Sequence, residues 1–500
     1  MKRRTFVKSI GAMFALPGMA QSSQFMKHKN WCQPKGKKPH HWQKNQCTQE
    51  EAFYLSYNFG PVEEEVTATD LEVVGELPKE LNGRYMRNGP NPFGCVDVNT
   101  HHWFMGDGMV HGVRLAEGRA IWYRNRYVRN YKIAEAFGED MCCRQLAAYS
   151  ANTHVIQQAG RTWAIAETGM PPVELSYELE TVGVNDFFGT LPEMAYTGHP
   201  KIDPDTGHLH AIAYKWPDFS DHVKYIDLGR DGRVKKTVDI PLPGMVMIHD
   251  MSLTSRYVVI YDLPVTINQQ MVDLGMIFPF AWNENYQPRV GLLPRDGTVD
   301  DIIWVEVSPC YVFHPMNAYD DENGNVVLDV CRHEYMFSSN GIAHDIQGTL
   351  DRWVINPTNG SVIEERIDDT PHEFPRCHPA LNSKPYRYGY SLALVPSGDT
   401  ITFPAILKYD MLSGVTTRFD LGPGRNGAEP YFIPREGATA EDDGYLVVFV
   451  HDTARDASEL LVLDASDLST TPLARVLLPV RVPYGFHGNW VPDDSCGPAV

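Results

Sequence analysis

The sequence has no excess of positive charge with which to bind a polyanion. Its 500 residues contain 44 Lys and Arg against 63 Asp and Glu, so the formal net charge at pH 7 is −19. Nucleic-acid binding depends on lysines and arginines that neutralise phosphates. The chain is therefore not expected to bind nucleic acid.

Several common catalytic and structural signatures are also missing. The nine cysteines form no Cys-x-x-Cys pair, which argues against a zinc ribbon or a thioredoxin-type redox site. The chain has no Gly-x-Ser-x-Gly motif and no recognisable Ser/His/Asp set, so no protein nucleophile is expected. After the N-terminus no run of about 18 apolar residues occurs, and no transmembrane helix is predicted.

The first 20 residues have the features of an export signal. A basic region contains Arg3-Arg4-x-Phe6-x-Lys8, a short apolar stretch runs from Ile10 to Leu16, and Gly18-Met19-Ala20 resembles a cleavage site. The paired arginines predict that residues 1–20 are a twin-arginine signal peptide and that the mature protein is periplasmic. A cytosolic protein with a chance basic start is the alternative.

Residues 21–60 are rich in lysine, with Glu50 as the first acidic residue. We interpret this segment as a flexible leader, with contact to a membrane surface as the alternative role. Cys32 and Cys47 within it form a disulfide candidate for an oxidising compartment. Residues 61–500 are then expected to form one domain.

From residue 71 onward the pattern is one of short strands separated by turns. Turn signals such as Gly83-Arg84 and Asn88-Gly89 recur about every 8–12 residues, which is typical of an all-β fold. Gly106-Asp107-Gly108 is interpreted as a hairpin turn, because it lacks the glycine spacing of a phosphate loop and the carboxylates of a calcium loop. One short helix is expected between Ile133 and Tyr149.

Four histidines recur along the chain, each between apolar residues and a turn former: His199, His249, His314 and His487. With Glu373 and Glu429 they form a series with about 50–65 residues between members, which is typical of propeller blades. Repeats of this length would bring the four histidines together at the axis, one per blade. Neutral imidazoles held in this way suit a metal such as Fe or Zn.

His314 shows how such a side chain is presented. His314 directly follows a strand-like run from Tyr311 to Phe313. The next residue, Pro315, is expected to end the strand and to restrict the conformation of the histidine. Glu167, Glu373 and Glu429 also stand between apolar residues and a turn former.

The chain resembles the carotenoid cleavage oxygenases, the non-haem iron family that also holds the lignostilbene dioxygenases and the retinal-pigment-epithelium isomerase. The resemblance runs from about Leu71 to Trp490 and rests on several long motifs in the right order. They are Asn82-Gly83-Arg84-Tyr85-Met86-Arg87-Asn88-Gly89-Pro90-Asn91-Pro92, His102-Trp103-Phe104-Met105-Gly106-Asp107-Gly108-Met109, Asn152-Thr153, and the segments around the four histidines and three glutamates.

This resemblance implies a seven-bladed β-propeller with a dome of loops and helices over its metal face. It implies one Fe(II) per chain, held by His199, His249, His314 and His487, with O₂ as co-substrate. Glu167, Glu373 and Glu429 would bind three of the imidazoles, leaving His249 without a glutamate. The implied reaction is dioxygenase cleavage of a conjugated C=C bond into two carbonyl products. Thr153 matches a position where its methyl group would restrict access to the metal.

The cleaved alkene stays open at this stage. The Arg87–Pro92 and His102–Phe104 motifs look like the carotenoid branch. Lys132 lies in the region where stilbene-cleaving members use a lysine to bind a phenol, but its neighbours differ and we interpret it as a surface residue. A metal-free binding propeller and a quinoprotein-type dehydrogenase are the alternatives from other classes. The first leaves the four histidines unexplained, and the second lacks a recognisable calcium and quinone site.

Other histidines are interpreted without a metal. His208 and His210 would share one face of a strand, but they follow an Asp-Thr-Gly turn, which predicts an exposed hairpin. The same interpretation, without a bound metal, applies to His333, His344 and His451.

The segment 271–282 departs from the strand pattern, because seven large apolar residues cluster there with only Asp273 charged. It is either core of the dome or an exposed apolar lip that takes a lipophilic substrate from a membrane. The sequence leaves both interpretations open.

Overall fold

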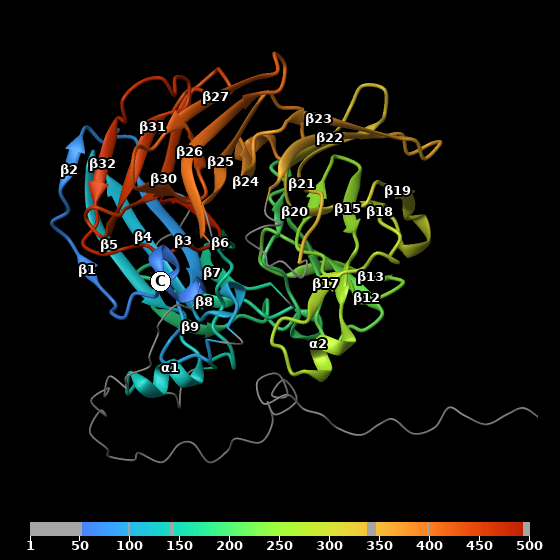
Figure 1. Cartoon of the computed structure of the whole chain (residues 1–500), viewed down its shortest axis with the longest axis horizontal. Coiled ribbons are helices and arrows are strands. Elements are labelled where there is room, and N and C mark those ends of the chain that lie inside the picture. Colours follow the sequence, from blue (N-terminus) through green and yellow to red (C-terminus); the bar gives the residue numbers. More distant parts are fainter. Residues whose placement is uncertain are drawn as a thin grey trace, which may run out of the picture.

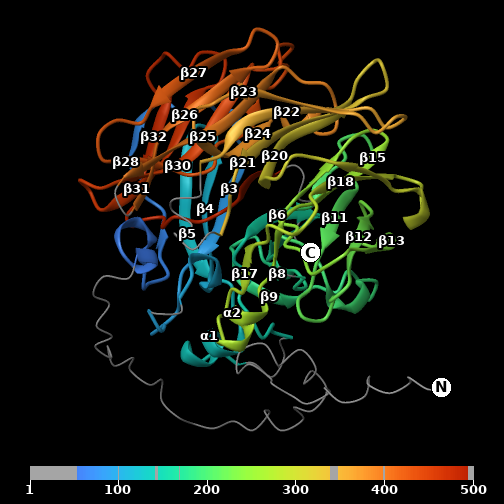
Figure 2. The same ribbon diagram turned by 45° about the vertical axis from the view of Figure 1, so that its right-hand side comes forward.

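The computed structural model describes residues 53–98, 101–140, 145–167, 169–337, 347–397 and 400–493. The predicted signal peptide and most of the predicted leader lie outside these residues. Within them, seven sheets of four to six strands are arranged around a common centre (Figures 1 and 2), which confirms the predicted seven-bladed propeller.

Four blades each consist of four consecutive antiparallel strands. The first is β6 (His154–Gln158), β7 (Arg161–Ile165), β8 (Val173–Leu175) and β9 (Thr181–Val184). The second is β10 (Lys201–Ile202), β11 (Leu209–Ala213), β12 (His222–Leu228) and β13 (Val234–Pro241). The third is β20 (Tyr311–Asp320), β21 (Val326–His333), β22 (Thr349–Ile355) and β23 (Val362–Asp368). The fourth is β24 (His372–Cys377), β25 (Tyr388–Ser397), β26 (Thr400–Asp410) and β27 (Val415–Asp420).

A fifth blade carries an insertion between its second and third strands. It consists of β14 (Met251–Leu253), β15 (Tyr257–Asp262), β18 (Arg289–Pro294) and β19 (Ile303–Glu306). The insertion holds a two-stranded sheet, β16 (Val265–Ile267) with β17 (Phe280–Trp282), and the helix α2 (Gln269–Asp273).

The last two blades close the ring, because each joins strands from both ends of the chain. One has the order β1 (Thr67–Ala68), β5 (Arg119–Tyr127), β4 (Gly108–Ala116), β3 (Gly83–Pro90) and β33 (Gly488–Pro492). The other has the order β2 (Val73–Gly75), β32 (Ala474–Leu477), β31 (Ala457–Asp464), β30 (Gly444–Asp452) and β28 (Arg425–Gly427), with β29 (Tyr431–Pro434) also paired to β30. Pairing of β3 with β33 holds the ring together by backbone hydrogen bonds.

Burial explains which sequences form which strands. The middle strand β30 is buried along nearly its whole length and reads Tyr-Leu-Val-Val-Phe-Val, because neighbouring blades cover both of its faces. The strand β13, at the edge of its sheet, alternates half-buried and exposed residues, with Lys235 on the exposed face. The first strands of successive blades contact one another around the centre, including β14 with β20 and β20 with β24.

Helices are few and short. The α-helix α1 (Tyr131–Ala136) and α2 lie on the same side of the molecule (Figures 1 and 2), and with loops they form the predicted dome. The 3-10 helices are η2 (Phe53–Leu55), η3 (Tyr57–Phe59), η4 (Trp103–Met105), η5 (Pro192–Met194), η6 (Val299–Asp301) and η7 (Pro379–Leu381). No helix of the described residues is long and apolar enough to cross a membrane.

The structure corrects several local expectations. The predicted helix ends at Ala136, and residues 145–149 are irregular. Gly106-Asp107-Gly108 is no hairpin turn but links η4 to β4, where a Cβ on Gly108 would lie 1.9 Å from the carbonyl oxygen of Ala151. Residues 53–60 are not a flexible leader, because Phe59 is buried against Trp103 and Tyr484.

Pro315 does not end its strand. The strand β20 continues to Asp320, and its register against β21 shifts on both sides of Pro315. Proline has no N–H to donate, and an irregularity in the ladder accommodates it without ending the strand. His314 therefore projects from a local break within a long strand.

Candidate metal centre

The four predicted histidines come together at the centre of the propeller. Each lies within the strand at one end of its sheet or shortly before that strand: His199 precedes β10, His249 precedes β14, His314 is in β20, and His487 precedes β33. All four are buried, and one ring nitrogen from each lies within 4.8 Å of the others. The Nε2 atoms of His249 and His314 are 3.1 Å apart.

This arrangement fits a bound metal ion. The Nε2 atom of His199 is buried without a hydrogen-bond partner in the protein, which is costly unless a ligand satisfies it. Burial lowers the pKa of His199 well below its ordinary value, and it lowers the pKa of His487 to about 3, against the raising effect of Glu429. These imidazoles are thus neutral at pH 7, as metal ligands must be.

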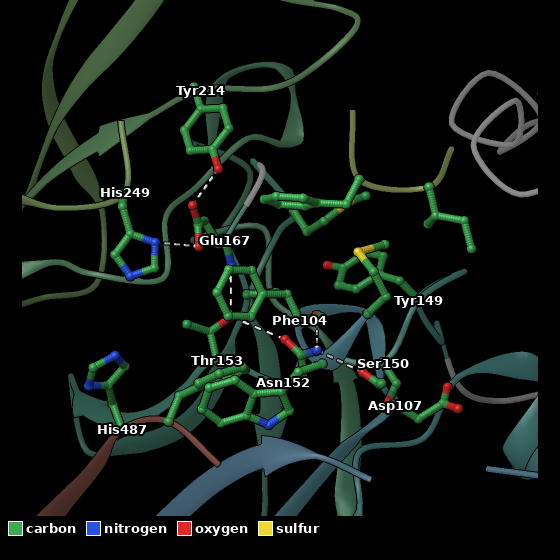
Figure 3. Close-up of a pocket in the computed structure, with 18 of the residues that line it drawn as sticks. Phe104, Asp107, Tyr149, Ser150, Asn152, Thr153, Glu167, Tyr214, His249 and His487 are labelled. Carbon is green, nitrogen blue, oxygen red and sulfur yellow. Dashed lines mark hydrogen bonds and ion pairs between the residues drawn. The ribbon is translucent and has the colours of Figure 1, made fainter. Parts of the chain in front are cut away.

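The three predicted glutamates each contact one imidazole. Glu373 Oε2 lies 2.6 Å from His314 Nδ1, Glu429 Oε1 lies 2.9 Å from His487 Nδ1, and Glu167 Oε2 lies 2.7 Å from His249 Nδ1. Figure 3 shows Glu167 between His249 and Tyr214. A carboxylate that accepts the Nδ1 proton leaves Nε2 free to face the centre.

The histidine without a glutamate is His199, so the expectation for His249 was wrong. The nearest carboxylate to His199 is Asp250, with Oδ2 at 4.0 Å from Nδ1. Lys201 Nζ donates to that oxygen at 2.7 Å, so the positive charge of the lysine neutralises Asp250.

Each glutamate has an outer partner that sequence reasoning missed. Tyr214 donates its hydroxyl hydrogen bond to Glu167, His333 Nε2 lies 2.7 Å from Glu373 Oε1, and Arg376 binds both oxygens of Glu429 at 2.7 and 2.9 Å. His333 is thus completely buried beside the site, rather than a surface histidine. No local motif in the sequence identifies Tyr214, His333 or Arg376 as partners of the glutamates.

Thr153 lines the cavity that opens from His249, His314 and His487. Its hydroxyl donates to Asn152 Oδ1 and accepts from the Glu167 backbone N–H, both at 3.1 Å (Figure 3). A Cβ on Gly198 would lie 2.8 Å from the Thr153 methyl carbon, so the methyl group packs tightly against the residue before His199. Thr153 thereby joins the loop of His199 to that of Glu167.

A cavity of about 660 Å³ opens from His249, His314 and His487. Its wall is dominated by aromatic and aliphatic side chains, among them Phe104, Phe278, Phe313, Leu394, Phe403 and Phe486. Residues from the dome loops, including Tyr149 and Ile277, complete it. Such a wall suits a long apolar molecule, since few polar groups along it would lose their water.

The histidines interpreted as structural stay outside the four-histidine group. His208 is partly exposed and pairs with Asp227 at 2.8 Å. His210 is buried, not exposed, and its Nδ1 lies 2.7 Å from the Tyr225 hydroxyl. His451 is also buried, and His344 lies outside the described residues.

Metal loading should weaken as the pH falls below the pKa of His249. Burial lowers that pKa, but the charge and hydrogen bond of Glu167, together with the charges of Asp250 and Glu373, raise it above its ordinary value of 6.5. Because the protonated imidazole cannot bind metal, affinity for Co²⁺ should fall about tenfold per pH unit below the pKa. Co²⁺ titrations at pH values from 8 to 5 measure this affinity. Glu167→Gln should move the onset to lower pH, and a pH-independent affinity would contradict the assignment.

Comparison with known proteins identifies relatives over nearly the whole described chain. The model of the family described as retinal pigment epithelial membrane protein matches residues 59–492. A carotenoid cleavage oxygenase of Mycobacterium tuberculosis is 42% identical, over 88% of this chain and 97% of its own length. A carotenoid 9,10(9',10')-cleavage dioxygenase of Crocus sativus is 34% identical, over 88% of this chain and 89% of its own.

Solved structures share the fold. The lignostilbene dioxygenase of Pseudomonas brassicacearum superposes with a TM-score of 0.80 at 28% identity, covering 88% of this chain and 98% of that chain. The cobalt-substituted Synechocystis apocarotenoid oxygenase gives a TM-score of 0.76 at 28% identity, covering 86% of this chain and 97% of that chain.

Proposed function

The chain belongs to the carotenoid cleavage oxygenase family, and from this premise we propose that it cleaves a conjugated C=C bond of a carotenoid or apocarotenoid. The reaction consumes O₂ and gives two carbonyl products. The observation that carries this function is the group of four buried histidines at one end of a long apolar cavity.

Fe(II) is the ion we assign to this group, one per chain. His199, His249, His314 and His487 would hold it through neutral nitrogens, a donor set that suits iron. When bound, it supplies the activation of O₂ that alkene cleavage requires. Glu167, Glu373 and Glu429 keep the Nε2 atoms of their histidines directed to the centre and return negative charge to the ring.

The residue that raised the stilbene alternative lies outside the cavity wall. Lys132, the residue that raised the stilbene alternative, directs its ammonium to the backbone oxygen of Phe93 at 2.7 Å. Its side chain is 60% exposed, and it does not line the cavity. A phenol in the cavity would therefore not meet this lysine.

Aerobic incubation with a β-apocarotenal and with a hydroxystilbene tests the proposal. We expect two carbonyl products from the polyene, identified by mass, and one iron per chain in the purified protein. Cleavage of the stilbene alone would reassign the substrate. A protein without metal would be a binding propeller, and one with calcium would indicate the quinoprotein class.

We also propose that the segment 271–282 contacts a membrane from which the substrate enters. Leu274 is 80% exposed, Met276 42% and Ile277 40%, whereas Phe280 is buried. Phe278 stacks on His102 with ring centroids 4.8 Å apart, and Ile277 to Phe280 line the cavity. The exposed apolar tip is therefore continuous with the cavity wall.

Liposome binding should depend on Leu274 and Ile277. Burial of each side chain in lipid stabilises the bound state by up to about 1.5–3 kcal/mol, so Leu274→Ser/Ile277→Ser should weaken binding at least about tenfold. Binding should resist salt, because an acidic chain gains nothing from anionic lipid. Leu412→Ser is the matched control, since Leu412 is 79% exposed in the turn after β26. Unchanged cosedimentation of the double variant would place the contact elsewhere.

Periplasmic location through twin-arginine export is the last part of the proposal. Cys95 is disulfide-bonded, and disulfides persist in oxidising compartments. Arg3→Lys/Arg4→Lys should leave the precursor in the cytoplasm when cell fractions are blotted. Accumulation of this variant in the periplasm would refute the twin-arginine route.

A further inference from the structure

The outer partners of the three glutamates differ in charge. Glu167 accepts from the neutral phenol of Tyr214. Glu373 accepts from the imidazole of His333. Glu429 accepts two hydrogen bonds from the Arg376 guanidinium, and its second oxygen also accepts from the Gly488 backbone N–H at 2.9 Å.

This difference in partner charge affects the site because the glutamates are buried. The side chains of Glu429 and Glu373 are only 2% and 7% exposed, so water screens their charges little. A guanidinium bound through two N–H groups withdraws far more charge from a carboxylate than a neutral donor does. Glu429 consequently has the least negative charge to share with its histidine.

The Nδ1–carboxylate distance is longest where arginine is the outer partner. It is 2.9 Å between His487 and Glu429, against 2.6 Å between His314 and Glu373 and 2.7 Å in the ion-pair contact of His249 with Glu167. Shorter contacts of this type accompany stronger hydrogen bonds. The imidazole whose glutamate is bound by arginine is thus the one held least strongly.

We propose that Tyr214, His333 and Arg376 are positioning residues that set how much negative charge each glutamate returns to its imidazole. His487 is then the weakest electron donor to the metal among the three glutamate-paired ligands, and His249 and His314 are stronger. This inference rests on the proposed metal function and assigns the electronic inequality of the site to residues outside the four-histidine group.

The midpoint potential of bound iron tests the inference directly. Tyr214→Phe removes only the hydroxyl group that shares the charge of Glu167. A more negative Glu167 favours Fe(III), so we expect the potential to fall by about 30 mV, a threefold change in the affinity ratio at about 59 mV per tenfold. Arg376→Gln should lower it further, and Arg376→Lys should restore it. Glu167→Gln should change the potential in the opposite direction and weaken iron binding.

Tyr225→Phe is the matched control, because its buried hydroxyl also contacts an imidazole, that of His210, outside the metal group. It should leave the potential unchanged. An iron-loaded Tyr214→Phe protein with unchanged or raised potential would overturn this inference and leave the oxygenase function standing. A wild-type protein that binds no iron would overturn both. If Arg376→Gln fails to fold, the midpoint potential of Tyr214→Phe alone tests the inference.

Discussion

His314→Ala should lose its metal and its alkene-cleaving activity while the propeller stays folded. His314 supplies one of four nitrogens to a buried centre, and its loss should cost more than the about 10–100-fold reported for groups that only support a ligand. The fold should survive, because Glu373 keeps His333 and the Phe374 backbone N–H as partners. Elemental analysis, circular dichroism and product mass measure the three properties. Replacing His199, His249 or His487 by alanine should have the same effect on metal content, activity and fold.

His451→Ala is the matched control for this variant. His451 is also a buried histidine in a central strand, β30, but it lies outside the four-histidine group. It should retain iron and turnover. A fully active His314→Ala protein would refute the assignment of the centre.

Glu373→Gln should keep the fold, weaken iron binding and slow turnover, by about 10–100-fold in affinity or rate. An amide oxygen still accepts the proton of His314 Nδ1 but returns less negative charge to the ring. The amide nitrogen would face His333 Nε2, and that imidazole can adjust because its Nδ1 has no hydrogen-bond partner and is free to take the proton. Chelator competition and steady-state kinetics give the two values.

His208→Ala provides the comparison for the glutamate variant. His208 lies between β10 and β11, pairs with Asp227 and has a side chain that is 30% exposed, so its loss should change neither iron content nor rate. If His208→Ala impairs the protein and Glu373→Gln does not, the site has been placed wrongly.

The sequence by itself determined the fold class and the identity of the four histidines. Turn residues and apolar strand patterns are local properties, and the interval between the histidines follows from one ligand per blade. Motifs such as His102-Trp103-Phe104 then specified the family over most of the chain. All of these signals lie within short segments or in their spacing.

Only the tertiary structure decided which groups pair across blades. Glu167 lies 82 positions before His249, and Arg376 lies 53 positions before Glu429, so their contacts depend on how blades pack and not on neighbouring residues. The same holds for His333, whose place beside Glu373 follows from the pairing of β21 with β20 and the contact of β21 with β24. Sequence could not tell whether Leu274 or Phe280 is exposed, because both are apolar. Only the tertiary structure packs Phe280 against Tyr214 and Phe278 and leaves Leu274 in water.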